Sequence, residues 1–457
     1  MAYTSIDDPT QFFNTILYTG NDADNRGITG VNFAPNWVWI KKRNNAAGGV
    51  ISDTVRGAGN VLYPSETNAE GSESASFVSF DSDGYTISQD AGVGLNVNSH
   101  TYVGWNWKAG GSAPAITYVV KVVSDSGNKY RFDDFGTSAV TLDLQEGGTY
   151  TFDQSDSSNS GHPLRFYTAS DKSGGEYTTG VTTTGTAGSS GAKTVITVAA
   201  SAPTLYYQCS SHSAMGGQVN TNSTFGSSNF SGSIQSTVSA NTAAGFSIST
   251  FTSPSSGTFT FGHGLSSAPK LVILKRRNGT QNWIVGHDSA GWGYWIKLNT
   301  QDARLSNTSM WQNTAPSSSI VSLDSSQIGA SNTFVAYCYS EKKGYSKFGK
   351  YEGASSTDGS FIYLGFKPAF FMARAIGRSE SWYMFDNKRL GYNVENAQLY
   401  ADATSSEAGT DYIDFLSNGV KYRYNSIGLN GSGEEYIYWA FAESPFVTST
   451  GVPTTAR

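Results

Sequence analysis

The chain has 457 residues and a net charge of −6, and only 14% of its residues are charged. A chain of this length exceeds one ordinary domain and suggests three or four. The negative charge argues against a nucleic-acid-binding protein, because such a protein needs a basic face to displace the counterions of the phosphates.

Glycine, hydroxyl-bearing and aromatic residues are abundant where charged residues are few: there are 51 glycines, and 13% of the residues are aromatic. This composition favours short strands joined by turns, and no long stretch has apolar residues at helical spacing. The sequence therefore predicts an all-β protein. The start of the chain, MAYTSIDDPTQFF, lacks the basic residues and apolar run of a signal peptide, and no segment is apolar for long enough to span a bilayer. We expect no export signal and no membrane insertion.

Three segments of the chain carry the same order of signals. Each has a proline, then an apolar strand that ends in basic residues, then an aspartate 18 or 19 residues after the proline, and finally an alternating aromatic strand. The prolines are Pro35, Pro269 and Pro368, the aspartates are Asp53, Asp288 and Asp386, and the aromatic strands cover 101–107, 333–341 and 435–443. Units of about 100 residues with this pattern predict three domains of the β-sandwich or jelly-roll type.

Several residues of the repeats invite a functional interpretation, and for each we favour a structural one. Asp53 and Asp386 precede Arg56 and Arg389 by three residues, which indicates local ion pairs better than the paired acids of a glycosidase. Five tryptophans that could stack on sugars are predicted to lie in the core: Trp37, Trp39, Trp283, Trp382 and Trp439. Six basic residues at strand ends are predicted to be exposed: Lys41, Lys42, Arg43, Lys275, Arg276 and Arg277.

Between the first and second repeats lies a segment unlike the repeats. It interrupts Gly/Ser/Asn-rich sequence, as expected for a domain inserted at exposed loops, and its short strands suit a Greek-key sandwich. We therefore predict four domains: a first repeat at 1–115, the insert at 116–222, a second repeat at 223–347 and a third repeat at 348–457. Because Cys209 and Cys338 fall in different domains, we expect no disulfide between them.

The insert carries residue types that together indicate a metal site. GHPLRF supplies His162, and LYYQCSSHSAM supplies Cys209, His212 and Met215. A thiolate, two imidazoles and a weak axial thioether are the ligands of blue-copper centres. In their order, these residues resemble those of a cupredoxin, and the resemblance implies a cupredoxin-like fold that binds copper through His162, Cys209, His212 and Met215. The alternative is a sandwich of the same kind whose site is empty or degenerate, in which Cys209 is only a small buried side chain.

The repeats contain longer phrases that also point to a family, among them YVGWNWKAGG, GSIQSTVSANTAAGFSI and AYCYSEKKGYSKFGKYEG. In these phrases the chain resembles a β-rich domain of virion structural and tail-fibre-like proteins from marine bacteriophages that infect cyanobacteria. The resemblance covers essentially the whole chain. It implies a virion protein, either a tail fibre or a head fibre or decoration, that assembles in the host cytoplasm.

The partners implied by this resemblance are other virion proteins, the host-cell surface and further copies of the same chain, without nucleic acid. The alternative is an enzyme displayed on the virion, either a copper-binding protein or one that degrades polysaccharides. The sequence shows no nucleophile–His–Asp arrangement, no phosphate loop and no second redox centre. We therefore expect a structural and adhesive protein and no enzyme.

Overall fold

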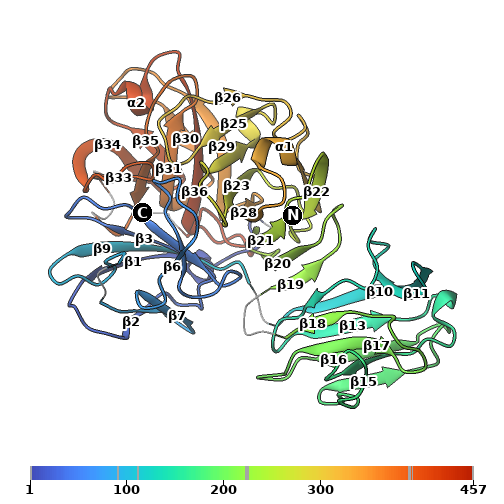
Figure 1. Cartoon of the computed structure of the whole chain (residues 1–457). Coiled ribbons are helices and arrows are strands. Elements are labelled where there is room, and N and C mark those ends of the chain that lie inside the picture. The colour runs from blue at the N-terminus through green and yellow to red at the C-terminus, as the bar shows by residue number, and fades with distance from the viewer. Residues whose placement is uncertain are drawn as a thin grey trace.

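The computed structural model describes residues 3–89, 92–110, 113–221, 226–389, 393 and 395–454. Strands form most of its regular structure (Figure 1), and the described α-helices are two single turns, α1 (Ser325–Ile328) and α2 (Ile427–Asn430). The predicted all-β, multidomain fold class is confirmed. Among the described helices, none is long and apolar enough to cross a bilayer.

Repeat 1 folds into two antiparallel sheets. The larger sheet has the order β1-β9-β3-β4-β5-β6, and the smaller sheet has the order β2-β8-β7. After the short turn η1 (Pro9–Gln11), the strands are β1 (Phe13–Thr19), β2 (Arg26–Thr29), β3 (Trp37–Lys42), β4 (Val50–Asp53), β5 (Asn60–Leu62), β6 (Gly71–Ser72), β7 (Phe77–Asp81), β8 (Gly84–Ile87) and β9 (Thr101–Trp107).

Repeat 2 has an antiparallel sheet of eight strands in the order β19-β20-β21-β28-β23-β24-β25-β26, and a separate pair, β22-β27. Its strands are β19 (Ser227–Asn229), β20 (Ser236–Asn241), β21 (Phe246–Thr252), β22 (Thr258–Gly262), β23 (Leu271–Arg276), β24 (Ile284–His287), β25 (Tyr294–Lys297), β26 (Leu305–Ser306), β27 (Ile320–Asp324) and β28 (Thr333–Tyr339). A short turn, η3 (Asp288–Ala290), follows β24.

Repeat 3 has one antiparallel sheet of eight strands in the order β29-β36-β31-β32-β33-β34-β35-β30. Its strands are β29 (Ser346–Glu352), β30 (Phe361–Tyr363), β31 (Phe366–Ala375), β32 (Tyr383–Asp386), β33 (Glu395–Tyr400), β34 (Ala408–Leu416), β35 (Gly419–Tyr422) and β36 (Glu435–Pro445). The strand β36 lies between β29 and β31, as β9 lies between β1 and β3 in repeat 1.

The three repeats share the arrangement and register of their central strands. In each, the aromatic closing strand (β9, β28 or β36) pairs on one side with an earlier strand (β1, β21 or β29) and on the other with the strand after the proline. The residue two positions after each proline pairs with a residue of the closing strand: Trp37 with Trp107, Leu271 with Tyr339, and Phe370 with Phe441. The predicted equivalence of the three prolines is therefore confirmed.

The aspartates are equivalent in only two of the repeats. The residue two positions after the proline also pairs with a residue of the following strand. That residue is Asp53 in repeat 1 and Asp386 in repeat 3, but it is His287 in repeat 2. The prediction that Asp288 is their equivalent is wrong, because its spacing of 19 residues places it one residue beyond that position. Asp288 instead forms a half-exposed ion pair with Lys270 (2.8 Å).

In repeats 1 and 3 the aspartate binds the arginine three residues later. The Asp53–Arg56 distance is 2.5 Å, the Asp386–Arg389 distance is 2.7 Å, and all four side chains are fully buried. The predicted local ion pairs are confirmed. In repeat 2 the two positions hold His287 and Ala290, so this ion pair is not formed there.

The same positions join the repeats to one another. Each contacts the closing strand of the next repeat: Asp53 accepts a hydrogen bond from the Tyr337 hydroxyl (2.7 Å), Asp386 accepts one from the Trp105 indole (2.9 Å), and His287 Nε2 lies 3.1 Å from the Tyr438 carbonyl oxygen. Because the last oxygen can only accept, Nε2 of His287 donates. The contacts run from repeat 1 to 2, from 2 to 3 and from 3 to 1, so the repeats form a closed arrangement that we call the three-repeat ring.

A buried cation crosses each interface of the ring. Six residues after the three prolines stand Lys41, Lys275 and Arg374, which are at most 1% exposed. Their side chains donate to backbone carbonyls of the adjacent repeat: Lys41 to Ala403 (2.7 Å), Lys275 to Thr67 (2.8 Å), and Arg374 to Lys297 (3.1 Å), Thr300 (3.2 Å), Gln301 (3.1 Å) and Asp302 (2.5 Å). The prediction that the six basic residues are exposed is wrong for Lys41 and Lys275, because their strands end at another repeat and not in solvent. The other four are half-buried: Lys42, Arg43, Arg276 and Arg277.

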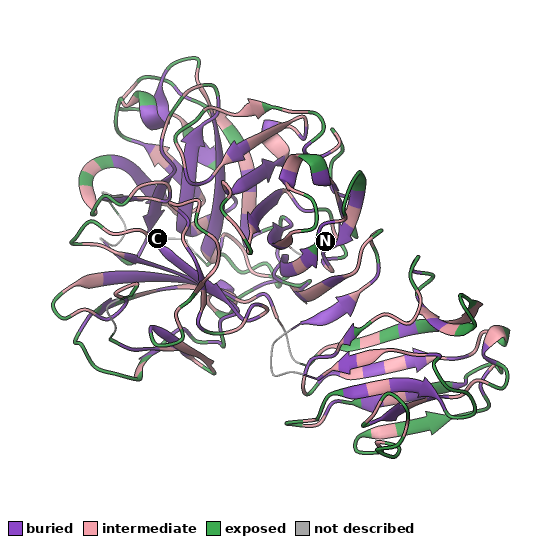
Figure 2. Ribbon diagram, in the orientation of Figure 1, coloured by how far each residue is buried: buried purple, intermediate pink, exposed green. Residues whose placement is uncertain are grey.

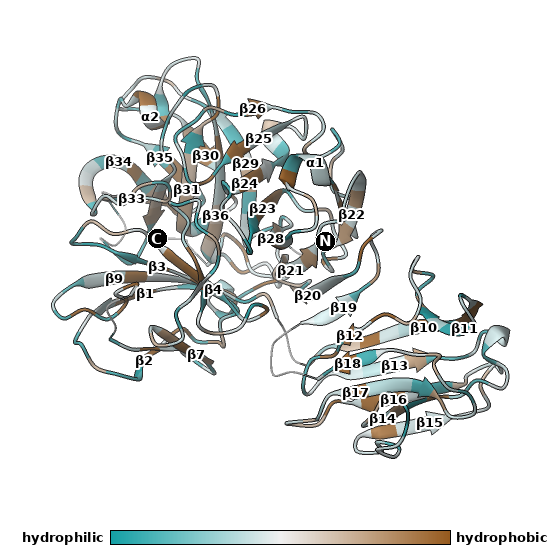
Figure 3. Ribbon diagram, in the orientation of Figure 1, coloured by the Kyte–Doolittle hydropathy of each residue, from teal (hydrophilic) through white to brown (hydrophobic). Residues whose placement is uncertain are grey.

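Aromatic side chains from all three repeats fill the centre of the ring. Their contacts cross the repeat boundaries, with ring centroids 5.0 Å apart for Trp37 and Tyr337, 5.8 Å for Phe13 and Phe370, and 5.8 Å for Tyr339 and Phe441. The five tryptophans predicted to lie in the core are at most 3% exposed, so that prediction is confirmed. Figure 2 shows the buried residues concentrated on the inner strands, and Figure 3 shows hydrophobic residues on the same strands.

The insert is a separate sandwich of two sheets beside the ring (Figure 1). The sheets have the orders β11-β10-β13-β16-β15 and β12-β18-β17-β14. Their strands are β10 (Ala115–Ser124), β11 (Asn128–Phe132), β12 (Leu142–Asp143), β13 (Thr149–Asp153), β14 (Leu164–Tyr167), β15 (Val181–Thr184), β16 (Lys193–Thr197), β17 (Leu205–Cys209) and β18 (Gln218–Asn220), with a short turn, η2 (Ser157–Asn159). Phe230, which lies beyond the expected end of the insert at residue 222, packs into the insert's core.

The buried histidines predict a pH dependence of folding. Burial lowers the pKa of His287 and of His263 to about 4, against about 6.5 in an unfolded chain. Between these values the unfolded state binds more protons, so stability falls as the pH drops from about 6.5 to 4. We expect each histidine to add up to about 1.4 kcal/mol per pH unit to this loss.

The measurement is urea unfolding across this pH range, with a variant that carries both His287→Asn and His263→Asn. The variant should lose stability less steeply than the unsubstituted protein. Parallel curves would contradict the assignment of two neutral, buried histidines.

Candidate metal centre

Strand pairing brings the distant histidine of the predicted site next to the cysteine. Cys209 is the last residue of β17, which pairs with β14 so that Leu164 lies opposite Cys209. The pairing continues beyond the strands, because the Ser210 amide donates to the Pro163 carbonyl (3.0 Å). The residue before this proline, His162, therefore lies beside Cys209 although 47 residues separate them.

Three of the four predicted ligands present their donor atoms to one point. Sγ of Cys209 lies 3.8 Å from Nδ1 of His162 and 3.5 Å from Nδ1 of His212. All three ligand atoms lie within 4.8 Å of one another, and the two imidazole rings have centroids 4.6 Å apart. With the bond lengths known for zinc, one ion holds a thiolate sulfur and an imidazole nitrogen about 3.6–3.8 Å apart at angles between tetrahedral and trigonal. The spacing fits one shared metal ion.

Met215, the fourth predicted ligand, is 1% exposed and belongs to the same hydrophobic core as Cys209. Its backbone is held at two points: its amide donates to Oε1 of Gln208 (3.1 Å), and its carbonyl accepts from the Tyr130 amide (2.9 Å). The structure therefore places Met215 on the interior side of the ligand loop.

The ligands differ in their access to solvent. Cys209 is fully buried, His162 is half-buried and His212 is exposed, so the group opens to the surface on its imidazole side. Burial lowers the pKa of His162 from its ordinary value, and the neighbouring His212 lowers it further. A lowered pKa keeps the imidazole neutral, which is the form that binds a metal.

Side chains that the sequence did not single out fix the backbone of His162. The Tyr130 hydroxyl (2.8 Å) and Nε2 of Gln154 (2.9 Å) both donate to the His162 carbonyl, and Oε1 of Gln154 accepts from the Leu164 amide (3.0 Å). Burial, followed by the adjacent Cys209, raises the pKa of Tyr130 and keeps its hydroxyl protonated. No spacing rule in the sequence links these residues to the ligands, because the link exists only in the folded sandwich.

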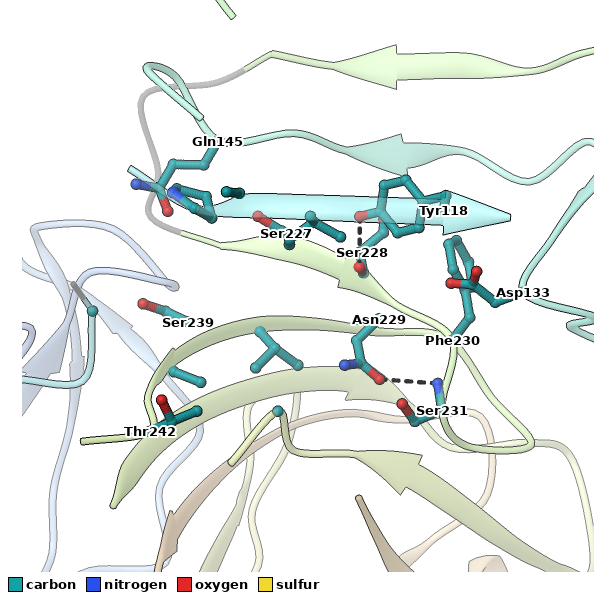
Figure 4. A pocket seen from close by; sticks show the side chains of 17 residues that line it. Tyr118, Asp133, Gln145, Ser227, Ser228, Asn229, Phe230, Ser231, Ser239 and Thr242 are labelled. Carbon is teal, nitrogen blue, oxygen red and sulfur yellow. Dashed lines mark hydrogen bonds between the residues drawn. The ribbon is translucent and has the colours of Figure 1, made fainter. Parts of the chain in front are cut away.

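A cavity of about 390 Å³ lies where the insert meets repeat 2 (Figure 4). Tyr118 from the insert lines it, opposite Ser239 of β20, and the Tyr118 hydroxyl donates to the Ser228 carbonyl (2.8 Å). None of the four predicted metal ligands lines this cavity. It belongs to the contact between insert and ring and is separate from the candidate metal centre.

Both cysteines are free, as predicted: Cys209 lies at the candidate metal centre and Cys338 in the core of repeat 2. Among the described residues, His162, Cys209 and His212 are the one group of three or more His, Cys, Asp or Glu side chains with such close ligand atoms.

Comparison with protein families gives one match, to a family described as a domain of unknown function, DUF7483, over residues 8–133 and 218–445. The chain belongs to this family. The DUF7483 match covers most of the three-repeat ring, whereas residues 134–217 of the insert lie outside it, together with all four predicted metal ligands. No curated protein and no solved structure matches the chain.

Proposed function

We propose that this DUF7483 protein is a structural component of a bacteriophage virion, exposed on the particle as a tail fibre or as a head fibre or decoration. The proposal rests on the resemblance of the repeats to such proteins, and the architecture of the ring supports it. Charged residues that recur in the sequence take part in contacts between repeats, as where Asp53, paired with Arg56, accepts a hydrogen bond from Tyr337 of repeat 2. The proposed partners are other virion proteins, the host-cell surface and further copies of the chain.

We further propose that the insert is a cupredoxin-like, Greek-key module that binds one copper ion. The observation that carries this proposal is the convergence of Cys209 Sγ with Nδ1 of His162 and of His212. A buried thiolate with two imidazoles favours a soft or borderline ion, and Met215 from the same core would supply a weak fourth ligand. When bound, copper would supply redox chemistry, and the protein would hold its ligands in place.

The alternative proposal, an enzyme that degrades polysaccharides, has less support. Its candidate acids were the repeated aspartates. Asp53 and Asp386 are fully buried in ion pairs with arginine, and the partly exposed Asp288 forms an ion pair with Lys270. An acid that cleaves a glycosidic bond has to reach the substrate and be able to exchange its proton. A copper enzyme remains the other alternative, and it would use the same ligand set as the proposed binding site.

The copper site can be tested by titrating the purified, metal-free protein with Cu(II). We expect one equivalent to bind and to produce an intense visible absorption from charge transfer between the Cys209 sulfur and the metal. Cys209→Ser should lose this absorption, because a hydroxyl is a poor substitute for a soft thiolate. Cys338→Ser is the matched control, since Cys338 is equally buried but lies in the core of repeat 2. Equal absorption in the two variants would refute the copper site.

The virion role predicts where the protein is found. Antibodies against the three-repeat ring should label intact particles in electron microscopy at one type of position, on the head or on the tail. Purified protein should bind host-surface glycans without releasing reducing ends. Unlabelled particles would contradict the virion proposal, and released reducing ends would favour the enzyme.

A further inference from the structure

One lysine of the insert contacts the loop that joins two of the proposed copper ligands. Lys172 follows β14, and its Nζ lies 3.2 Å from the Cys209 carbonyl oxygen, 3.3 Å from that of Ser210 and 3.3 Å from that of His212. An ammonium group has three N–H donors, and each of these carbonyls can accept one. The loop from Cys209 to His212 is therefore folded around a single positive charge.

The loop that carries Lys172 is itself held in place. The Lys172 amide donates to the Ala169 carbonyl (3.1 Å), the Gly175 amide donates to the Lys172 carbonyl (3.1 Å), and the Thr168 hydroxyl donates to the Gly174 carbonyl (2.8 Å). Lys172 has φ of +68°, a left-handed conformation that side chains other than glycine adopt infrequently. The surrounding hydrogen bonds hold this backbone conformation, from which the Lys172 side chain extends to the ligand loop.

We propose that Lys172 is a positioning residue of the copper site, and this inference rests on the proposed function. Its three hydrogen bonds set the shape of the Cys209–His212 loop before metal arrives. Its charge then favours the reduced ion, because Cu(I) bound to a thiolate carries one positive charge less than Cu(II) at the same site. Lys172 thus acts on the site through the backbone of two ligand residues and through its electrostatic field.

The test compares three variants of the full chain. Lys172→Met removes the charge and the three hydrogen bonds but keeps a long side chain. Lys172→Arg keeps the charge. Lys193→Met removes an equal charge from an exposed position at the start of β16 and serves as the matched control.

Two measurements are made on each variant. The first is the ratio of Cu(II) to Cu(I) at a fixed potential, followed by the charge-transfer absorption. We expect Lys172→Met to shift this ratio about tenfold toward Cu(II), which is about 59 mV for a one-electron couple. Lys193→Met should shift it less than about twofold, and Lys172→Arg should stay close to the unsubstituted protein. The second measurement is amide hydrogen exchange at residues 210–214 in the metal-free proteins, which should be faster in Lys172→Met than in Lys193→Met.

The outcomes separate this inference from the proposed function. Equal potentials and equal exchange in Lys172→Met and Lys193→Met would overturn the role of Lys172 while leaving the copper site intact. Failure of the unsubstituted protein to bind copper would overturn the proposed function and the electrostatic role of Lys172. Faster exchange in the metal-free Lys172→Met variant would still support the positioning of the loop.

Discussion

The ring depends on one repeated contact, in which a buried cation at the end of a strand reaches backbone carbonyls of the neighbouring repeat. Lys41, Lys275 and Arg374 make this contact at the three interfaces. A buried charge without partners costs several kcal/mol, so each cation can remain buried only because the neighbouring repeat supplies its acceptors. The cyclic order of the contacts means that each repeat supplies the cation of one interface and the acceptors of another. The three repeats thus depend on one another for stability.

Sequence patterns predicted the all-β class and the equivalence of the repeats, because both depend on local signals such as prolines and alternating aromatic residues. They failed where a long-range contact decides the outcome. Lys41 resembles an exposed strand-end charge, and only the packing of repeat 3 against it shows that it is buried. Asp288 was mistaken for the equivalent aspartate because it directly follows the true position. That position lies 18 residues after the proline in every repeat and holds His287 in repeat 2.

The proposed copper site was likewise predictable from the sequence only in part. Its ligands could be listed from the sequence because His162, Cys209, His212 and Met215 are rare residue types in this chain, with 5 histidines, 2 cysteines and 5 methionines. The residues that hold those ligands could not, because lysine, glutamine and tyrosine are common and their roles come only from the folded sandwich. The insert lies largely outside the DUF7483 match, and its hydrophobic core is separate from that of the ring.

The most direct test of this account is a crystal structure of the protein soaked with copper, with anomalous scattering measured at the copper absorption edge. The account predicts one strong peak in the insert, about 2.0–2.3 Å from Cys209 Sγ and from Nδ1 of His162 and of His212. The same crystal should show the three repeats closed into a ring by Lys41, Lys275 and Arg374. The absence of a peak at these atoms, or a peak at another group of residues, would contradict the assignment of the insert as a copper-binding module.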